Sequence, residues 1–187
     1  MLPISSISTS FLDWPSDEHA AILFIAGCGH HCRGCQSPVL QDPSAGRMLE
    51  VEEGLVDFIY DYCVRNRTRN LVLSGGDPLS YPEDVQRLMD MLKDKDPDMR
   101  FCIYTGFDYE AASAMVHGYD FIKCGRYVME SARPSSKDDD RMVLASPNQR
   151  MYDGSGRCLS RDGVVDLRRA ARPTGSLKRN GSITGES

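Results

Sequence analysis

The stretch Ala20-Ala-Ile-Leu-Phe-Ile-Ala-Gly-Cys-Gly-His-His-Cys-Arg-Gly-Cys35 decides how this chain is built. Its first seven residues form an unbroken apolar run, which is typical of a short strand buried on both faces. Gly27 ends the run, and a loop with three cysteines follows directly. The sequence therefore predicts a buried strand that delivers a cysteine-rich loop to one edge of a sheet.

Strand and helix patterns alternate after this loop, which predicts an α/β fold with a parallel sheet. The expected elements are a helix at 51–65, a strand at 71–73, a helix from Pro82, a strand at 100–104, a helix at 109–117 and a strand at 119–123. Three of the four expected strands end in glycines, at Gly27, Gly75–Gly76 and Gly106. Ligands bind at the carboxyl ends of parallel strands, so we expect the functional site at this edge.

The composition is that of an ordinary globular protein. The 187 residues are 26% charged and 41% hydrophobic, with a net charge of −5, so we expect no nucleic-acid partner. No apolar run reaches about 18 residues and residues 1–10 do not read as a signal peptide, so we expect no membrane span and a cytoplasmic location.

Residues 1–159 are expected to form one domain. Residues 160–187, rich in Gly, Ser, Arg and Thr, are expected to be a disordered tail, with a basic partner-binding arm as the alternative.

The three clustered cysteines predict a metal centre. Cys28, Cys32 and Cys35 have the spacing Cys-x-x-x-Cys-x-x-Cys, and three thiolates on one loop can bind three corners of a [4Fe–4S] cluster. The fourth iron is then open to a substrate. The rival interpretations are a structural zinc with His30 or His31 as fourth ligand, and three cysteines without a metal.

These motifs resemble the radical S-adenosylmethionine (SAM) superfamily, and more narrowly the activating proteins of anaerobic (class III) ribonucleoside-triphosphate reductase. The matching segments run in the family's order over roughly residues 15–155. They are Gly27–Cys35, Leu73-Ser-Gly-Gly-Asp-Pro-Leu79, Tyr104-Thr-Gly-Phe107, Gly125-Arg126 and Ser146-Pro-Asn-Gln-Arg150. Gly34, before the last cysteine, matches this subgroup rather than the wider superfamily. Pro147 stands where a serine is expected.

The resemblance implies a [4Fe–4S] cluster and SAM as cofactors, with Cys28, Cys32 and Cys35 as the metal ligands. It implies reductive cleavage of SAM and formation of a glycyl radical on the large subunit of the reductase. A one-electron donor such as reduced flavodoxin is a further expected partner, and a homodimer is left open. The residues expected to bind or adjoin SAM are Gly34, Ser74, Gly75, Gly76, Asp77, Pro78, Thr105 and Asn148. Asp77 is expected to place negative charge near the ammonium group of SAM.

Chain length supports an open architecture. A complete eight-unit (β/α) barrel needs about 200 to 250 residues, so we expect an incomplete barrel whose open side can admit a protein loop. Two alternatives remain: a radical SAM enzyme of the deazaguanine-synthase type that acts on a small molecule, and a zinc-binding interaction module without enzymatic activity.

Overall fold

The computed structural model describes residues 1–170, which fold around one central sheet. Within these residues seven strands form the main sheet. In spatial order they are β3 (Arg47–Leu49), β1 (Leu2–Ser10), β2 (Ala20–Ile25), β4 (Asn70–Gly75), β5 (Arg100–Tyr104), β6 (Phe121–Cys124) and β9 (Arg150–Asp153). The central pairs β2–β4, β4–β5 and β5–β6 are parallel. The outer pairs β1–β2, β1–β3 and β6–β9 are antiparallel.

The α/β prediction is confirmed, but the expectation of a parallel sheet holds only for its centre. The sheet is mixed and unclosed, running from β3 at one edge to β9 at the other. The polar strand β1 precedes the first element expected from the sequence, and it gains its conformation from pairing with β2 and β3. The residues of β1 carry no strand pattern of their own, so the neighbouring strands determine its conformation.

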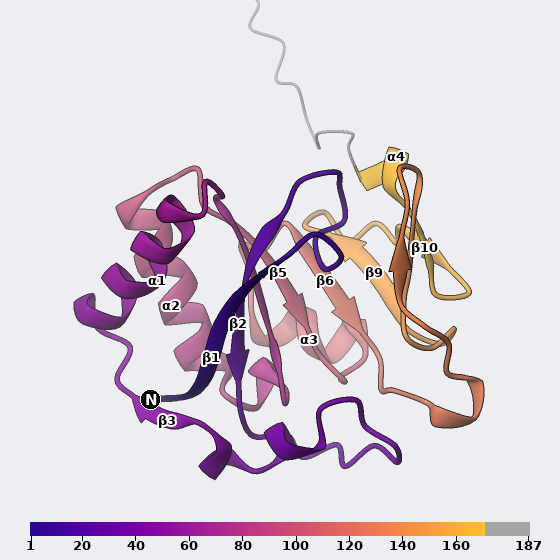
Figure 1. The fold of residues 1–187 in the computed structure, drawn as a ribbon, viewed down its shortest axis with the longest axis horizontal. Coiled ribbons are helices and arrows are strands. Elements are labelled where there is room, and N and C mark those ends of the chain that lie inside the picture. The colour runs from indigo at the N-terminus through magenta and orange to yellow at the C-terminus, as the bar shows by residue number, and fades with distance from the viewer. Residues whose placement is uncertain (171–187) are drawn as a thin grey trace, which may run out of the picture.

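Helices cover one face of the main sheet. They are α1 (Glu53–Arg65), α2 (Pro82–Lys95) and α3 (Tyr109–Met115), and Figure 1 shows α1 and α2 together on one side. Alternate residues of each central strand point to this layer, because successive side chains in a strand face opposite ways. Leu71 and Leu73 of β4 lie in the core under the helices, whereas Val72 lies in the core on the opposite face.

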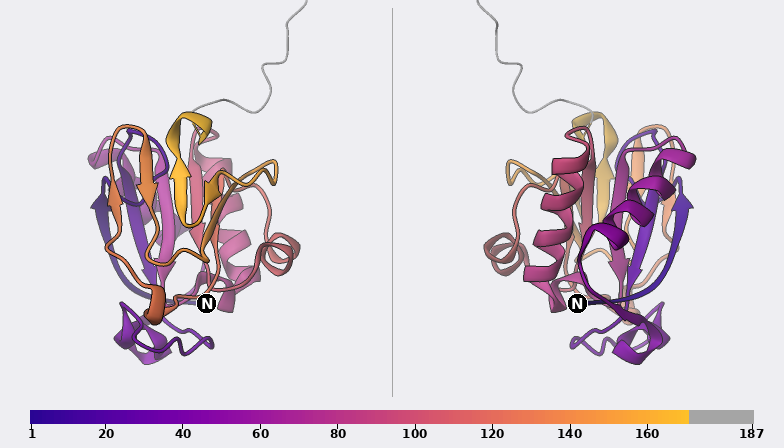
Figure 2. Two further views of the ribbon diagram at one scale, coloured as in Figure 1. Left: turned by 90° about the vertical axis from the view of Figure 1, so that its right-hand side faces the viewer. Right: turned by 90° about the vertical axis from the view of Figure 1, so that its left-hand side faces the viewer.

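A smaller sheet covers part of the opposite face. Its strands, in order, are β10 (Ser160–Arg161), β11 (Val164–Asp166), β8 (Arg141–Val143) and β7 (Ser136–Lys137), and α4 (Leu167–Ala170) follows β11. Figure 2 shows the orange and yellow strands of the smaller sheet against the main sheet. Trp14, Phe121 and Val165 are buried between them.

The smaller sheet corrects the predicted start of the tail. Residues 160–170 were expected to be disordered, but they form β10, β11 and α4, with Val165 and Leu167 buried. The prediction for 171–187 concerns residues outside the described part of the chain. Within residues 1–170 no helix is both long enough and apolar enough to cross a bilayer.

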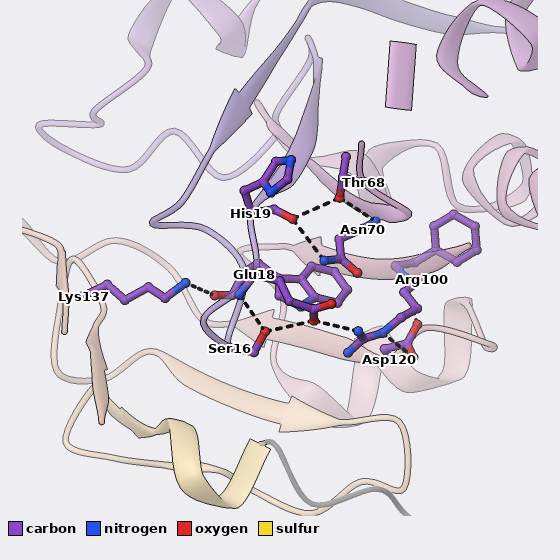
Figure 3. A network of polar contacts seen from close by, with 10 residues as sticks. Ser16, Glu18, His19, Thr68, Asn70, Arg100, Asp120 and Lys137 are labelled. Atoms are coloured by element: carbon purple, nitrogen blue, oxygen red, sulfur yellow. Dashed lines mark hydrogen bonds and ion pairs between the residues drawn. The ribbon is translucent and has the colours of Figure 1, made fainter. Parts of the chain in front are cut away.

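The segment between β1 and β2 is fixed at the amino ends of the central strands by the polar contacts of Figure 3. Thr68 and Asn70 both donate to the carbonyl of His19 at 3.0 Å. Arg100 donates to Glu18 at 2.8 Å. Burial raises the pKa of Glu18, but the charge and hydrogen bond of Arg100, together with the hydrogen bond from Ser16, leave this pKa below its ordinary value. The opposite, carboxyl ends of the strands remain available for the site.

Candidate functional site

The cysteine loop lies at the carboxyl end of β2, beside the end of β4. In Figure 1 the arrows of β2, β5 and β6 all point toward the side where this loop runs. Backbone hydrogen bonds fasten the base of the loop. Gly27 and Cys28 donate to Leu40 and Gln41 at 2.8 and 3.0 Å, and Asp77 donates its N–H to the Gly27 carbonyl at 2.8 Å. The chain leaves the loop through the 3-10 helices η1 (Pro38–Gln41) and η2 (Pro43–Ala45).

Positive φ angles bend this loop back on itself. Gly27 and Gly34 have φ of 90° and 67°, where glycine meets no steric penalty. His31 has φ of 48°, which is uncommon for a residue with a side chain. A Cβ on Gly34 would also collide with the side chain of Met129, at the start of the 3-10 helix η4 (Met129–Ser131). Gly34 is therefore needed for the shape of the loop.

A cavity of about 350 Å³ opens between the loop and the strand ends. The predicted site residues that line it are Cys28, Cys32, Cys35, Ser74, Gly75, Gly76 and Thr105. The fold thus brings together, on one surface, thiols from the loop after β2 and groups from the ends of β4 and β5. This is the edge at which the sequence placed the functional site.

Four predicted residues do not line this cavity. Gly34 is exposed at the turn of the loop, and Pro78 is buried at the start of the 3-10 helix η3 (Pro78–Ser80). Asn148 is exposed and donates its amide to the carbonyl of Arg126 at 2.8 Å. Asp77 is completely buried beneath the cavity. The roles of these residues toward a ligand stay predictions, and for Asp77 a direct contact does not fit its burial.

The Asp77 carboxylate is a centre of hydrogen bonding rather than an open negative charge. It accepts from Leu79 N–H at 2.9 Å, from Gly106 N–H at 2.8 Å and from the Thr105 hydroxyl at 2.9 and 3.0 Å. The Nε2 atom of His30 lies 2.7 Å from its Oδ2. These partners come from η3, from the end of β5 and from the cysteine loop, so one buried side chain joins three segments of the site.

The cavity also contains polar side chains that were not among the predicted site residues. The ammonium of Lys123 lies 4.1 Å from the centre of the Tyr104 ring, and burial lowers the pKa of Lys123. The Tyr104 hydroxyl donates to the Asp13 carbonyl at 2.8 Å, and burial raises the pKa of Tyr104 well above its usual range. Tyr104 and Lys123 could have been found from their positions at strand ends. Asp13, in the segment after β1, gave no signal in the sequence.

A second and wider hollow, of about 640 Å³, adjoins the first. His30, Gly106, Gly125 and Arg126 line both hollows, so the two share one wall. The other residues that line the outer hollow are Gly29, Ser80, Phe107 and Asp108. The site therefore has an inner cavity with the thiols and an outer one open to larger molecules.

The donor set fits an iron–sulfur cluster. All three loop thiols are unpaired and partly exposed, and burial raises the pKa of the Cys28 thiol. Within residues 1–170 no three His, Cys, Asp or Glu side chains converge as the ligands of a single metal ion. Thiolates that bind a cubane cluster attach to different irons, so they surround a shared space rather than one point. Cys28, Cys32 and Cys35 line one cavity, as such ligands would.

The remaining cysteines lie away from this cavity. Cys63 is buried under the helices and Cys102 on the opposite face of the sheet, as expected for small core residues. Burial raises the pKa of Cys63, and likewise that of Cys124 on β6, to about 12. Cys158 is partly exposed and lies 3.3 Å from the Ser160 carbonyl.

Comparison with known proteins agrees with this site. Residues 19–152 match the family described as "4Fe-4S single cluster domain". The anaerobic ribonucleoside-triphosphate reductase-activating protein of Haemophilus influenzae is 31% identical over 122 residues, which are 60% of this chain and 77% of that protein. The proteins of the same name from Vibrio cholerae and Enterobacteria phage T4 are 30% and 28% identical. They are matched over 60% and 70% of this chain and over 76% and 81% of their own length.

A relative with another name also matches. The 7-carboxy-7-deazaguanine synthase of Methanothermobacter thermautotrophicus is 27% identical over 134 residues, which are 65% of this chain but 47% of that enzyme.

The family model and the activating-protein relatives together define the family. The chain belongs to the 4Fe-4S single cluster domain family and, within that class, to the anaerobic ribonucleoside-triphosphate reductase-activating proteins.

Proposed function

We propose that this protein is a radical SAM activase that generates a glycyl radical on anaerobic ribonucleoside-triphosphate reductase. The observation that carries the proposal is the single cavity in which Cys28, Cys32 and Cys35 face the glycine-rich ends of β4 and β5. Membership of the activating-protein family supports the same reaction. Bound there, a [4Fe–4S] cluster and SAM would supply one-electron cleavage of the sulfonium C–S bond, giving methionine and a hydrogen-abstracting 5′-deoxyadenosyl group.

The chain's own residues bind and orient these groups. Cys28, Cys32 and Cys35 would hold the cluster through three of its irons. Ser74, Gly75 and Gly76 line the cavity, and the methionyl part of SAM would lie against them. Thr105 shapes the cavity wall, while its hydroxyl is engaged by Asp77. Gly34, Pro78 and Asn148 contribute through the shape of the loops around SAM.

The open side of the sheet suits a protein substrate. Residues 1–170 form one radical SAM domain in this proposal, an incomplete barrel rather than a closed one. A closed barrel would enclose a small molecule, whereas the outer hollow beside His30 and Arg126 can admit a loop of a large partner. The hydrogen to be removed must lie within a few ångströms of the adenosyl carbon, so the reductase has to dock over these strand ends. A donor such as reduced flavodoxin would supply the electron in the cytoplasm.

The test is to mix the reconstituted protein with SAM, reductant and the anaerobic reductase of the same organism. We expect a glycyl-radical doublet in electron paramagnetic resonance that disappears when the radical-site glycine of the reductase is changed to alanine. If SAM is cleaved, the reductase stays radical-free and a small molecule is turned over, the deazaguanine-synthase type of activity replaces this proposal. Stoichiometric zinc without iron uptake would favour the interaction module.

A further inference from the structure

His30 makes a buried contact from the middle of the cysteine loop to the body of the protein. Its Nε2 atom lies 2.7 Å from Asp77 Oδ2, and Arg126 Nε–H donates to its Nδ1 at 3.3 Å. Because Nδ1 accepts a hydrogen bond, Nε2 carries the proton and donates to the carboxylate. The side chain is 11% exposed, and its ring packs edge-to-face on Phe107 with centroids 4.6 Å apart.

Other contacts in the middle of the loop are weaker. His31 reaches Gln41, and Arg33 reaches Glu130, each at 3.4 Å between exposed side chains. Exposed contacts of this kind contribute little to stability. The hydrogen bond from His30 is charge-assisted and sheltered, and such bonds are about twice as strong as neutral ones. The loop's position over the cavity therefore depends mainly on His30.

The backbone next to His30 supports this reasoning. His31 holds a left-handed conformation with φ of 48°, which costs about 1 kcal/mol or more for a residue with a side chain. Such a conformation persists when neighbouring contacts fix the chain on both sides. His30 supplies the fixed point on one side, and Cys32 follows on the other.

The space that the His30 ring occupies depends on Gly106. A Cβ on Gly106 would overlap this ring and lie 2.7 Å from its Nε2 atom. Gly106 N–H donates to the same Asp77 oxygen that accepts from His30. The absence of a side chain at Gly106 thus leaves room for the ring beside the carboxylate.

We propose that His30 is a positioning residue that holds the cysteine loop over the strand ends before iron binds, and that Asp77 acts through this hydrogen bond rather than by touching SAM. The assignment of Cys28, Cys32 and Cys35 to a cluster rests on the proposed function. The positioning itself does not, because it is a property of the metal-free chain.

The test is hydrogen–deuterium exchange of residues 27–36 in the metal-free, reduced protein. His30→Phe keeps the aromatic contact with Phe107 but removes the donor, and we expect exchange in the loop to rise by about tenfold or more. His30→Gln retains an N–H that can reach Asp77, and we expect it to restore near-native exchange. If His30 acted by packing alone, His30→Gln would exchange faster than His30→Phe, because phenylalanine fills the space of the ring better than glutamine.

Gly106→Ala provides a second variant, which displaces the His30 ring without replacing any hydrogen-bonding side chain. Its matched control is Gly29→Ala in the same loop, because a Cβ there meets nothing within 4 Å. We expect faster loop exchange in Gly106→Ala and native exchange in Gly29→Ala. Far-UV circular dichroism checks that each variant is folded.

A second readout is retention of iron against a chelator after reconstitution. We expect iron loss to accelerate in His30→Phe and Gly106→Ala, but not in His30→Gln. Native loop exchange in His30→Phe, or equally fast exchange in His30→Gln and His30→Phe, would overturn the proposal. Because exchange is measured without iron, SAM or reductase, these outcomes are separate from failure of the activase function.

Discussion

Replacing Asp77 by alanine should destabilise the whole protein rather than only weaken ligand binding. The change removes the acceptor for Leu79 N–H, Gly106 N–H, the Thr105 hydroxyl and His30. Each buried donor left without a partner costs about 1–3 kcal/mol. The Leu79 N–H is fully buried, whereas the Thr105 hydroxyl can rotate and His30 can turn toward water. We therefore expect a loss of roughly 3–5 kcal/mol in the free energy of unfolding.

Urea unfolding of the metal-free protein measures this loss, because iron and SAM then contribute nothing to stability. The matched control is Asp90→Ala on the exposed face of α2, where the carboxylate accepts one hydrogen bond from Gln86. That change should stay within about 0.5 kcal/mol. If Asp77→Ala lost less than about 1 kcal/mol and weakened SAM binding instead, Asp77 would face the ligand as the sequence predicted, and its role as a buried acceptor would be refuted.

Three further expectations concern the chain's end, its acid stability and the strand ends. A protein ending after Ala170 should retain its cluster, whereas one ending after Arg161 loses the buried Val165 and should unfold at lower urea; equal midpoints would show that β11 contributes nothing. Burial raises the pKa of Asp153, but hydrogen bonds from Ser155 and Arg157 outweigh burial and hold this pKa below its ordinary value of 3.8. The stability that the ionised carboxylate contributes is therefore present above pH 3.8 and is lost as the pH falls through the lower pKa of the folded protein. Asp153→Asn should flatten that acid limb in urea titrations, and an unchanged slope would contradict this. Gly76→Ala should abolish iron retention, because its Cβ would meet two backbone carbonyls; normal iron content would refute the close approach.

The sequence predicted the centre of the fold well. The apolar run at β2 and the strands β4, β5 and β6 carry their signal in consecutive residues, as do the apolar faces of α1 and α2. The edges carry no such signal. β1 is rich in serine and becomes a strand by pairing with β2 and β3. β11 is a short segment in a polar stretch, and it buries Val165 against the main sheet.

The site was predicted to the level of the strand end, but not to the direction of each side chain. Glycine-ended strands placed the thiols, Gly75, Gly76 and Thr105 on one edge, and these residues line one cavity. The inward direction of Asp77 depends on partners 28 and 47 residues away in the sequence, Thr105 and His30. The spacing of residues in a motif does not show whether a carboxylate contacts a ligand or accepts hydrogen bonds from backbone N–H groups of the same protein.

The activase assignment is tested most directly by counting products in one reaction. The reconstituted protein is incubated anaerobically with SAM, reductant and its reductase, and 5′-deoxyadenosine is quantified beside the glycyl radical on the reductase. We expect equal amounts of the two in the first turnover, and neither product when Cys32→Ala replaces the native protein. Cys63→Ala, which changes a buried core cysteine outside the cavity, should still give both products. Formation of 5′-deoxyadenosine with no radical on the reductase would contradict the account.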